Sequence, residues 1–221
     1  VYSNLWEMDT MKGEQIPDLA AEMPIPLNDD YTSFKVVLTQ GIKWSDGEDF
    51  DAEDVVFTFN ELLRLKDVLS ASAACANIEY VDKYELIINT VDSRPRIAED
   101  LGATTWGNLY RIIPEHYWKD HDLTTDLYES PLATGPYTLE SYDPNGYWFL
   151  YKLRDDAEFS DVGVLTGKVP QPKYVLFTAY GTEEKKTMAM LNNEVDILCD
   201  ISPESWEVLL DGNDKVACWL P

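Results

Sequence analysis

Cysteine and histidine are scarce in this sequence. Three cysteines and two histidines occur among its 221 residues, and no two cysteines form a Cys-x-x-Cys pair. Because the cysteine count is also odd, neither a disulfide framework nor a thiolate zinc site is predicted. Cys199 and Cys218 stand in apolar runs, where we expect small, buried side chains.

The run Asp120-His121-Asp122 contains residue types that bind metal ions. Three adjacent residues in regular structure cannot all face one ion, and a surface loop explains the run as well. His116 stands among aromatic residues, so it is expected to be packed or exposed rather than catalytic. We therefore expect neither a metal nor a cofactor.

Basic residues are also few, because 17 of them stand against 41 acidic residues and give a net charge of −24. Such a field repels phosphate backbones and anionic lipids, so binding to nucleic acid or to a membrane surface is not expected. No apolar run is long enough to span a bilayer. The composition is nevertheless 45% hydrophobic, which is enough to form a sizeable core.

Sequence signatures of catalysis are missing. The chain has no Gly-x-Ser-x-Gly elbow, no phosphate-binding loop and no His-Glu-x-x-His. A pair of catalytic carboxylates remains open, because 41 acids form pairs by chance and the sequence cannot place them. Asp46 stands in a turn and Asp54 in the first turn of a helix, so structural roles are predicted for both. The chain is expected not to be an enzyme.

Most of the chain gives clear local signals. β-Branched and aromatic residues predict a strand at 31–39, and a helix at 52–65 follows an N-cap at Asp51. Hairpins are expected at 78–91, around Asp82-Lys83, and at 135–153, around Asp143-Pro144-Asn145-Gly146. Further expected elements are a helical start at 98–110, a short helix at 114–118 and a loop at 122–134.

The last third of the chain follows a different order. Strands are predicted at 173–179, 195–199 and 215–220, with helices at 182–192 and from Ser202 to Gly212. A β-α-β-α-β order implies parallel strands joined by right-handed crossovers. The predicted fold class is therefore α/β, with a mixed α+β unit in the middle of the chain.

One stretch is much more specific. Residues 17–59 contain Pro-Asp-Leu-Ala-Ala-Glu, a strand, Gly-Ile-Lys-Trp-Ser-Asp-Gly and Ala-Glu-Asp-Val. This order resembles the signature of family 5 solute-binding proteins, the peptide, nickel and oligopeptide group of ABC importers. The matching residues are Pro17, Leu19, Ala20, Glu22, Trp44, Ser45, Asp46, Gly47, Ala52, Asp54 and Val55. Ala21 adds one residue to the first element.

Three later elements resemble the same family in the same order. They are Ile113-Pro114-Glu115-His116, Thr134-Gly135-Pro136-Tyr137 and Asn193-Glu194-Val195-Asp196-Ile197. Ala133 and Asn193 stand where the family usually has glycine. The resemblance covers nearly the whole chain.

The resemblance implies a clamshell of the periplasmic-binding-protein type II kind. Residues 1–17 and 131–221 would form its first lobe, and residues 18–130 the extra α+β domain of the family. The second lobe would follow Pro221 and be absent here. Since the chain opens at Val1 without a signal peptide and stops just after a strand-like run, we expect a fragment of a longer protein.

The implied function is capture of a peptide or similar small solute outside the cell and its delivery to ABC permease subunits. Family members are exported, either free in a periplasm or anchored as lipoproteins, and a monomer is expected. Two alternatives stay open: a ligand-sensing receptor domain on the same fold, and a secreted acidic hydrolase.

The resemblance also implies where ligand would bind. The segment that includes Ser3, Asn4 and Leu5 runs along the cleft in the family, where its backbone can pair with an extended peptide. Trp106 lies near the junction of the extra domain and the first lobe, and Trp219 ends a strand that leads into the cleft. For each of the five, packing in the core or in a turn is the competing interpretation.

Overall fold

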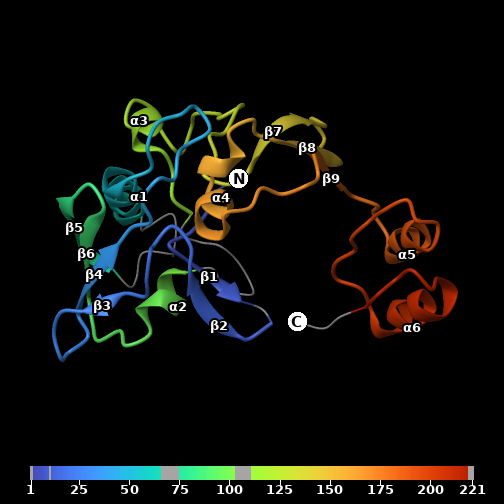
Figure 1. Ribbon diagram of the computed structural model, residues 1–221, viewed down its shortest axis with the longest axis horizontal. Coiled ribbons are helices and arrows are strands. Elements are labelled where there is room, and N and C mark those ends of the chain that lie inside the picture. Colours follow the sequence, from blue (N-terminus) through green and yellow to red (C-terminus); the bar gives the residue numbers. More distant parts are fainter. Residues whose placement is uncertain (1, 10, 66–74, 103–110, 219–221) are drawn as a thin grey trace. The chain divides into compact units, whose positions relative to one another are not determined.

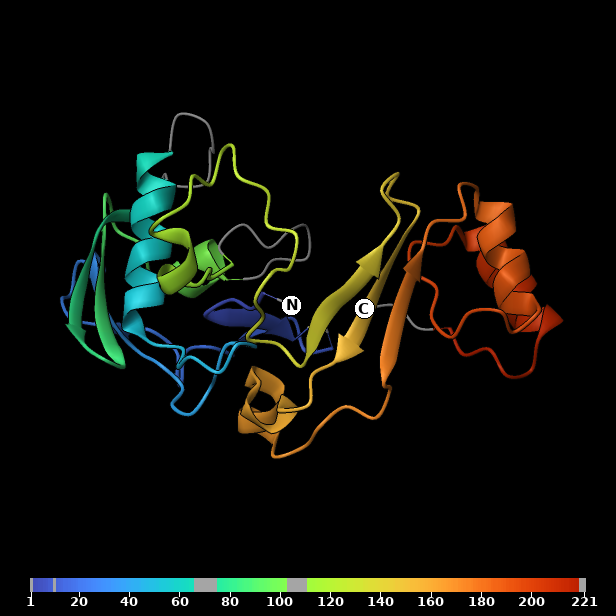
Figure 2. The same ribbon diagram turned by 90° about the horizontal axis from the view of Figure 1, so that it is seen from above.

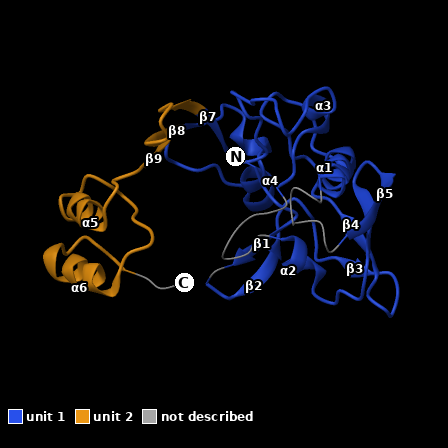
Figure 3. Ribbon diagram, turned by 180° about the vertical axis from the view of Figure 1, so that it is seen from behind, with its two compact units in different colours: residues 1–139, 151–174 blue, residues 140–150, 175–221 orange. Residues whose placement is uncertain are grey.

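The structure is a computed structural model that describes all residues except 1, 10, 66–74, 103–110 and 219–221 (Figure 1). The chain divides into two compact units (Figure 3). Unit 1 comprises Val1–Leu139 and Tyr151–Tyr174, whereas unit 2 comprises Glu140–Leu150 and Val175–Pro221. Unit 1 contains most of the secondary structure and the main hydrophobic core.

The core of unit 1 forms against an antiparallel sheet in the order β3-β4-β6-β5. Phe34 and Val36 alternate with less buried residues along β4, and they pair with Ile88 and Leu86 across the ladder. Because side chains alternate between the two faces of a strand, these four fill the same face of the sheet. The strands are Ile25–Pro26 (β3), Ser33–Val37 (β4), Cys75–Asp82 (β5) and Glu85–Thr90 (β6).

Helix α1 (Ala52–Arg64) contacts β5 and β6 (Figure 2). Its start is capped reciprocally. The Asp51 carboxylate accepts a hydrogen bond from the Glu53 amide at 2.8 Å, and the Asp54 carboxylate accepts one from the Asp51 amide at 3.2 Å. These bonds satisfy amides that no helical carbonyl can reach. Phe59 is fully buried on the apolar face of α1, and such burial stabilises by about 2–3 kcal/mol.

Shorter elements complete unit 1. Strands β1 and β2 form an antiparallel hairpin in which Trp6 pairs with Pro17, and α2 contacts β1. The Trp6 indole is fully buried and donates a hydrogen bond to the Glu22 carbonyl at 3.0 Å, which fixes the chain after the hairpin. The bounds are Trp6–Asp9 (β1), Glu14–Pro17 (β2), Ile97–Leu101 (α2), Glu115–Trp118 (α3), Ala157–Phe159 (a 3₁₀ helix) and Asp161–Thr166 (α4).

Strands β7 (Tyr137–Tyr142), β8 (Trp148–Leu153) and β9 (Tyr174–Thr178) form a second sheet in that order. The Leu153 amide donates to the Lys173 carbonyl at 2.9 Å, and the Ala179 amide donates to the Tyr147 carbonyl at 2.8 Å. These bonds join opposite ends of the two strands, so β9 runs antiparallel to β8.

Two helices, α5 (Glu183–Leu191) and α6 (Pro203–Gly212), follow β9 and contact each other. The Glu183 carboxylate accepts hydrogen bonds from the Ser202 amide and the Ser205 hydroxyl, both at 2.6 Å, and these bonds lower the pKa of that carboxyl to about 2. At the other ends of the helices, the Asn213 side-chain amide donates to the Leu191 carbonyl at 3.1 Å. The two helices are thus joined by polar contacts at both ends.

Most of the predicted elements are confirmed. The strand at 31–39, the hairpins at 78–91 and 135–153, and the helix at 52–65 with its Asp51 cap are all present. The same holds for the strand at 173–179, the helices at 182–192 and after Ser202, the short helix after Pro114 and the loop at 122–134. Of the helical start predicted at 98–110, Ile97–Leu101 is helical, and residues 103–110 lie outside the described part.

The predicted parallel β-α-β-α-β arrangement is wrong for the residues that the structure describes. Residues 195–199 and 215–218 are not strands, and β9 pairs antiparallel with β8. A strand needs a neighbouring strand to satisfy its amides and carbonyls, and no described strand pairs with these segments. Ile197 is accordingly 81% exposed. The prediction that Cys199 and Cys218 are buried is also wrong, because Cys199 is exposed and Cys218 is partly exposed.

Candidate ligand-binding site

The segment Ser3–Leu5, which resemblance assigned to the cleft, is buried inside unit 1. Its carbonyls already accept hydrogen bonds from within the chain. The Ser3 carbonyl accepts from the Ile112 amide at 3.0 Å, and the Asn4 carbonyl accepts from the Leu19 amide at 3.1 Å. The Leu5 carbonyl accepts from two amides, at 3.0 and 3.1 Å. Hydrogen bonds to these three carbonyls therefore hold the segment in place within unit 1.

The side chains of this segment contact two acidic groups, of which Asp161 is buried and Glu7 is partly exposed. The Ser3 hydroxyl donates to the carboxylate of Asp161, the first residue of α4, and the Asn4 side-chain amide donates to the Glu7 carboxylate at 2.7 Å. Asp18, which directly follows β2, is also buried and accepts a hydrogen bond from the Asn4 amide. We call Ser3, Asn4, Glu7, Asp18 and Asp161 the acidic network.

Burial shifts the protonation of this network. It raises the pKa of Asp18 to about 8, and the negative charges of Asp161 and Glu7 raise that pKa further. The hydrogen bond from the Asn4 amide lowers the pKa in part. Burial likewise raises the pKa of Asp161, and the hydrogen bond from Ser3 opposes that shift. Desolvation disfavours a buried carboxylate, so Asp18 holds its proton at neutral pH. The network can therefore bind and release a proton near physiological pH.

Two buried polar atoms in or next to the network have no hydrogen-bond partner among the described residues. They are Oδ1 of Asn4 and Oγ1 of Thr134, and both residues are fully buried. Thr134 adjoins the network because its carbonyl accepts a hydrogen bond from the Asp161 amide at 3.0 Å. Among the described residues, no group of three or more histidine, cysteine, aspartate or glutamate side chains could hold a metal ion.

The sequence elements that carried the family resemblance meet around Asp54. Its carboxylate accepts hydrogen bonds from the Trp44 indole at 2.9 Å and from the Glu115 amide at 2.8 Å. Burial raises its pKa to about 6, and the three donors that it accepts from counteract the shift.

The neighbouring turn residues Ser45 and Asp46 also contact later elements. His116 pairs with Asp46 across 2.9 Å, and the Ser45 hydroxyl accepts from the Ala133 amide at 3.1 Å. The structural roles predicted for Asp46 and Asp54 are therefore confirmed.

Arg154 is the most connected side chain that sequence reasoning missed. Its guanidinium is buried and donates to the carbonyls of Lys43 and Trp44, both at 3.0 Å, and of Ala133 at 3.1 Å. It also forms a bidentate pair with Asp156 at 2.7 and 2.8 Å, which lowers the pKa of that carboxyl. Arg154 thus joins the end of β8 to two segments far away in the sequence. Its partners are mostly backbone carbonyls, which leave no side-chain signal.

Asp18 and Asp161 were missed as well, because nothing in their sequence context separates them from the other acids of this chain. Trp106 and Trp219, the two remaining predicted ligand contacts, lie outside the described residues. The structure therefore brings Ser3 and Asn4 together with acids that were not predicted.

Comparison with known proteins agrees with the signature elements. The model of the bacterial extracellular solute-binding proteins, family 5 (middle), matches residues 14–217, and the chain therefore belongs to this family. The probable peptide-binding protein YejA of Agrobacterium fabrum is 26% identical over 190 residues, which is 80% of this chain and 29% of that protein. The chain thus spans under a third of the length of this relative.

Solved structures show the same fold at low sequence identity. An oligopeptide-binding protein of Thermotoga maritima with bound mannohexaose has a TM-score of 0.76 at 21% identity, over 94% of this chain and 37% of that one. AppA of Bacillus subtilis with a nonapeptide has a TM-score of 0.74 at 18% identity, over 96% and 40%. NikA of Brucella suis with Fe(III)-EDTA also reaches 0.74, at 21% identity, over 96% and 41%.

These neighbours are type II periplasmic binding proteins, which confirms the predicted fold class and the mixed α+β organisation. The family consists of transport binding proteins rather than enzymes. Among the described residues, no helix is both long enough and apolar enough to cross a bilayer.

Proposed function

We propose that this chain is part of the substrate-binding component of an ABC importer, which captures peptides or a similar small solute and delivers it to a membrane permease. The observation that carries the proposal is the family match over residues 14–217. Two similar proteins support the peptide class, since the relative from Agrobacterium fabrum is a probable peptide-binding protein and AppA holds a nonapeptide. The protein acts on the extracellular side of the membrane, in a periplasm or as a lipoprotein, as a monomer without catalysis.

In this proposal residues 1–17 and 131–221 belong to one lobe of a clamshell, and residues 18–130 form an additional domain. A second lobe is contributed by chain outside this sequence. Ser3, Asn4, Leu5, Trp106 and Trp219 lie along the cleft. The fold of the solved neighbours and the order of the signature elements support this division.

The test is mass spectrometry of small molecules released when the full-length protein, purified from its own host, is denatured. Short peptides are the expected result. Sugars or metal chelates would keep the transport class and refute the peptide assignment. A protein that releases nothing, and whose melting temperature no peptide, sugar or chelate raises, would refute the binding function.

The assigned contacts have a separate test in the same full-length protein. Trp106→Ala and Trp219→Ala are each expected to weaken peptide binding at least tenfold, because a stacked indole contributes strongly to recognition. Trp148→Ala, on β8, is the matched control and should leave the affinity unchanged. Equal affinities of all three variants would remove both tryptophans from the site.

A further inference from the structure

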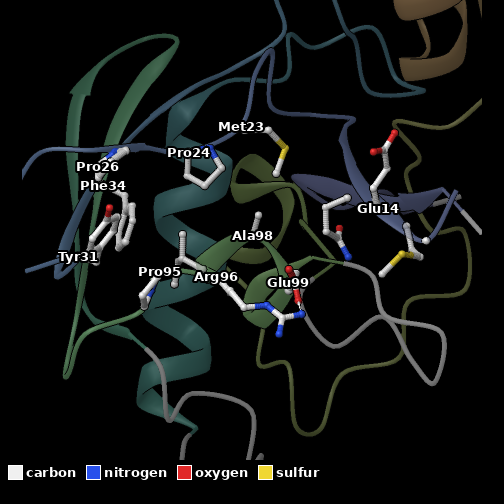
Figure 4. Close-up of a pocket in the computed structure, with 14 residues that line it drawn as sticks. Glu14, Met23, Pro24, Pro26, Tyr31, Phe34, Pro95, Arg96, Ala98 and Glu99 are labelled. Atoms are coloured by element: carbon white, nitrogen blue, oxygen red, sulfur yellow. Dashed lines mark hydrogen bonds and ion pairs between the residues drawn. The ribbon is translucent and has the colours of Figure 1, made fainter.

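A cavity of about 440 Å³ lies within unit 1, and no residue of the acidic network lines it (Figure 4). It is bounded by the β1–β2 hairpin, by the chain around β3 and by the residues around the start of α2. Its volume falls within the range of small-molecule sites in proteins. The family signature elements around Asp54 do not line it.

One end of the cavity is apolar and rigid. Tyr31 and Phe34 stand beside Pro26 in Figure 4, with Pro95 below them and Pro24 above the opening. Proline and aromatic rings lose little conformational entropy when a ligand binds, since few of their bonds rotate. Met23 also lines the cavity and stands between Pro24 and Glu14 in Figure 4. This end therefore suits a flat aromatic group.

The backbone of Tyr31 is strained where it presents its ring to the cavity. Its φ is 54°, a left-handed conformation that bulky residues rarely adopt. The Tyr31 carbonyl accepts a hydrogen bond from the Arg94 amide at 2.8 Å, which helps to hold this conformation. The side chain remains 40% exposed, so the strain does not serve to bury the ring. Strain of this kind concentrates at binding sites.

The other end of the cavity carries charge. Glu14, Arg96 and Glu99 line it, on the side opposite Tyr31 and Phe34 in Figure 4. Arg96 is already paired with Glu99, whereas Glu14 has only a 3.5 Å contact with Lys12, and both of those side chains are mostly exposed. Lys12 also pairs with Asp9, so three carboxylates stand against Lys12 and Arg96 at and beside this end, within a chain of net charge −24. The local and the overall field both attract a cation.

We propose that this cavity binds a small organic cation that carries an aromatic ring. The ring lies against the exposed Tyr31 side chain and the prolines beside it, and the ammonium group faces Glu14 and Glu99. This site is independent of the proposed peptide cleft, because none of the residues assigned to that cleft lines the cavity.

Methionine methyl groups provide a direct test, because Met8 and Met23 line the cavity whereas Met188 and Met190 lie in α5. The 221-residue chain is labelled with ¹³C-methyl methionine and titrated with tryptamine, an aromatic ammonium ion. The ring current should shift the Met8 and Met23 signals with a Kd on the order of 1 mM, as expected for so small a ligand. The Met188 and Met190 signals should stay in place.

Charge is tested with indole-3-propionate, which has a similar shape and the opposite charge. It should shift the same signals at least tenfold more weakly. Equal shifts with both compounds would refute the cation assignment, and absence of Met8 and Met23 shifts up to 20-fold the expected Kd, roughly 20 mM tryptamine, would refute the site.

Variants separate the two ends of the cavity. Glu14→Gln combined with Glu99→Gln should weaken tryptamine at least tenfold, and Tyr31→Leu should weaken both compounds. Glu48→Gln, an exposed carboxylate outside the cavity, is the matched control and should leave tryptamine binding unchanged. The near-ultraviolet circular dichroism of Trp6 and Trp44, which are fully buried in unit 1, reports that each variant is folded. Tryptamine affinity that is equal in all the variants would overturn the proposal even if the methyl groups shift.

Discussion

The two units differ in how completely they bury their apolar side chains. In unit 1 a continuous core extends from Leu5 to Ile112 and packs a four-stranded sheet against α1. On the helices of unit 2, Met188, Val208 and Leu210 are about half exposed, and Leu209 is the one fully buried residue of α6. Unit 1 therefore has its own hydrophobic stabilisation, whereas unit 2 relies more on hydrogen bonds at helix ends.

Matched leucine truncations should expose this difference most strongly. Leu86→Ala, in the sheet of unit 1, is expected to cost about 3 kcal/mol of unfolding free energy, because the leucine is fully buried and leaves a cavity. Leu210→Ala, on α6 of unit 2, should cost less than about 0.5 kcal/mol since the side chain is 48% exposed. Urea denaturation followed by circular dichroism measures both. Equal costs would contradict the contrast between the units.

Removing the guanidinium of Arg154 tests whether polar contacts also hold unit 1 together. Arg154→Met should cost about 2–3 kcal/mol, because the carbonyls of Lys43, Trp44 and Ala133 lose a buried donor. Hydrogen exchange should accelerate around these carbonyls and remain unchanged in α5 and α6. Arg111→Met, at an exposed arginine, serves as the control. Uniform acceleration in both units would mean that they unfold together.

The acidic network gives unit 1 a dependence on pH. The folded-state pKa of Asp18, about 8, lies above its ordinary value of 3.8, so the folded chain binds more protons between those pH values. The unfolding free energy must then fall as pH rises from about 4 to about 8. Asp18→Asn imitates the protonated acid and should stabilise the protein by about 2 kcal/mol at pH 7.

The measurement is the melting temperature at pH 5, 7 and 8. In Asp18→Asn the melting temperature should fall less steeply with rising pH than in the parent chain. Part of the fall should remain, because burial also raises the pKa of Asp161 and Asp54. Asp155→Asn, at an exposed site, is the control. A variant that declines as steeply as the parent chain would exclude a buried, protonated Asp18.

Local signals explain which parts of the fold were predictable. The Asp51 cap, the turn at Asn145-Gly146 and the alternation along β4 each act within a few residues, and all are present. Residues 195–199 have the composition of a strand, but no described strand pairs with them, and composition cannot supply that partner.

The candidate site shows the same limit more sharply. Resemblance placed Ser3 and Asn4 at a site, but their contacts with Asp161 and Glu7 depend on how the chain packs. Burial rather than residue type distinguishes Asp18 from the exposed acids, and burial is a property of the whole unit. Arg154 acts through backbone carbonyls, which every residue has.

The smallest expected effect concerns the helix ends of unit 2. The Ser202 hydroxyl caps α6 by accepting from the Ser205 amide at 3.2 Å, and replacing such a cap by alanine costs about 1 kcal/mol. Because unit 2 buries little apolar surface, Ser202→Ala should accelerate hydrogen exchange throughout α6. Ser160→Ala removes the equivalent cap of α4 in unit 1, where the packed surroundings should confine the change to one turn. Accelerated exchange that spreads equally far along α4 and α6 would mean that helix caps contribute equally to the stability of both units.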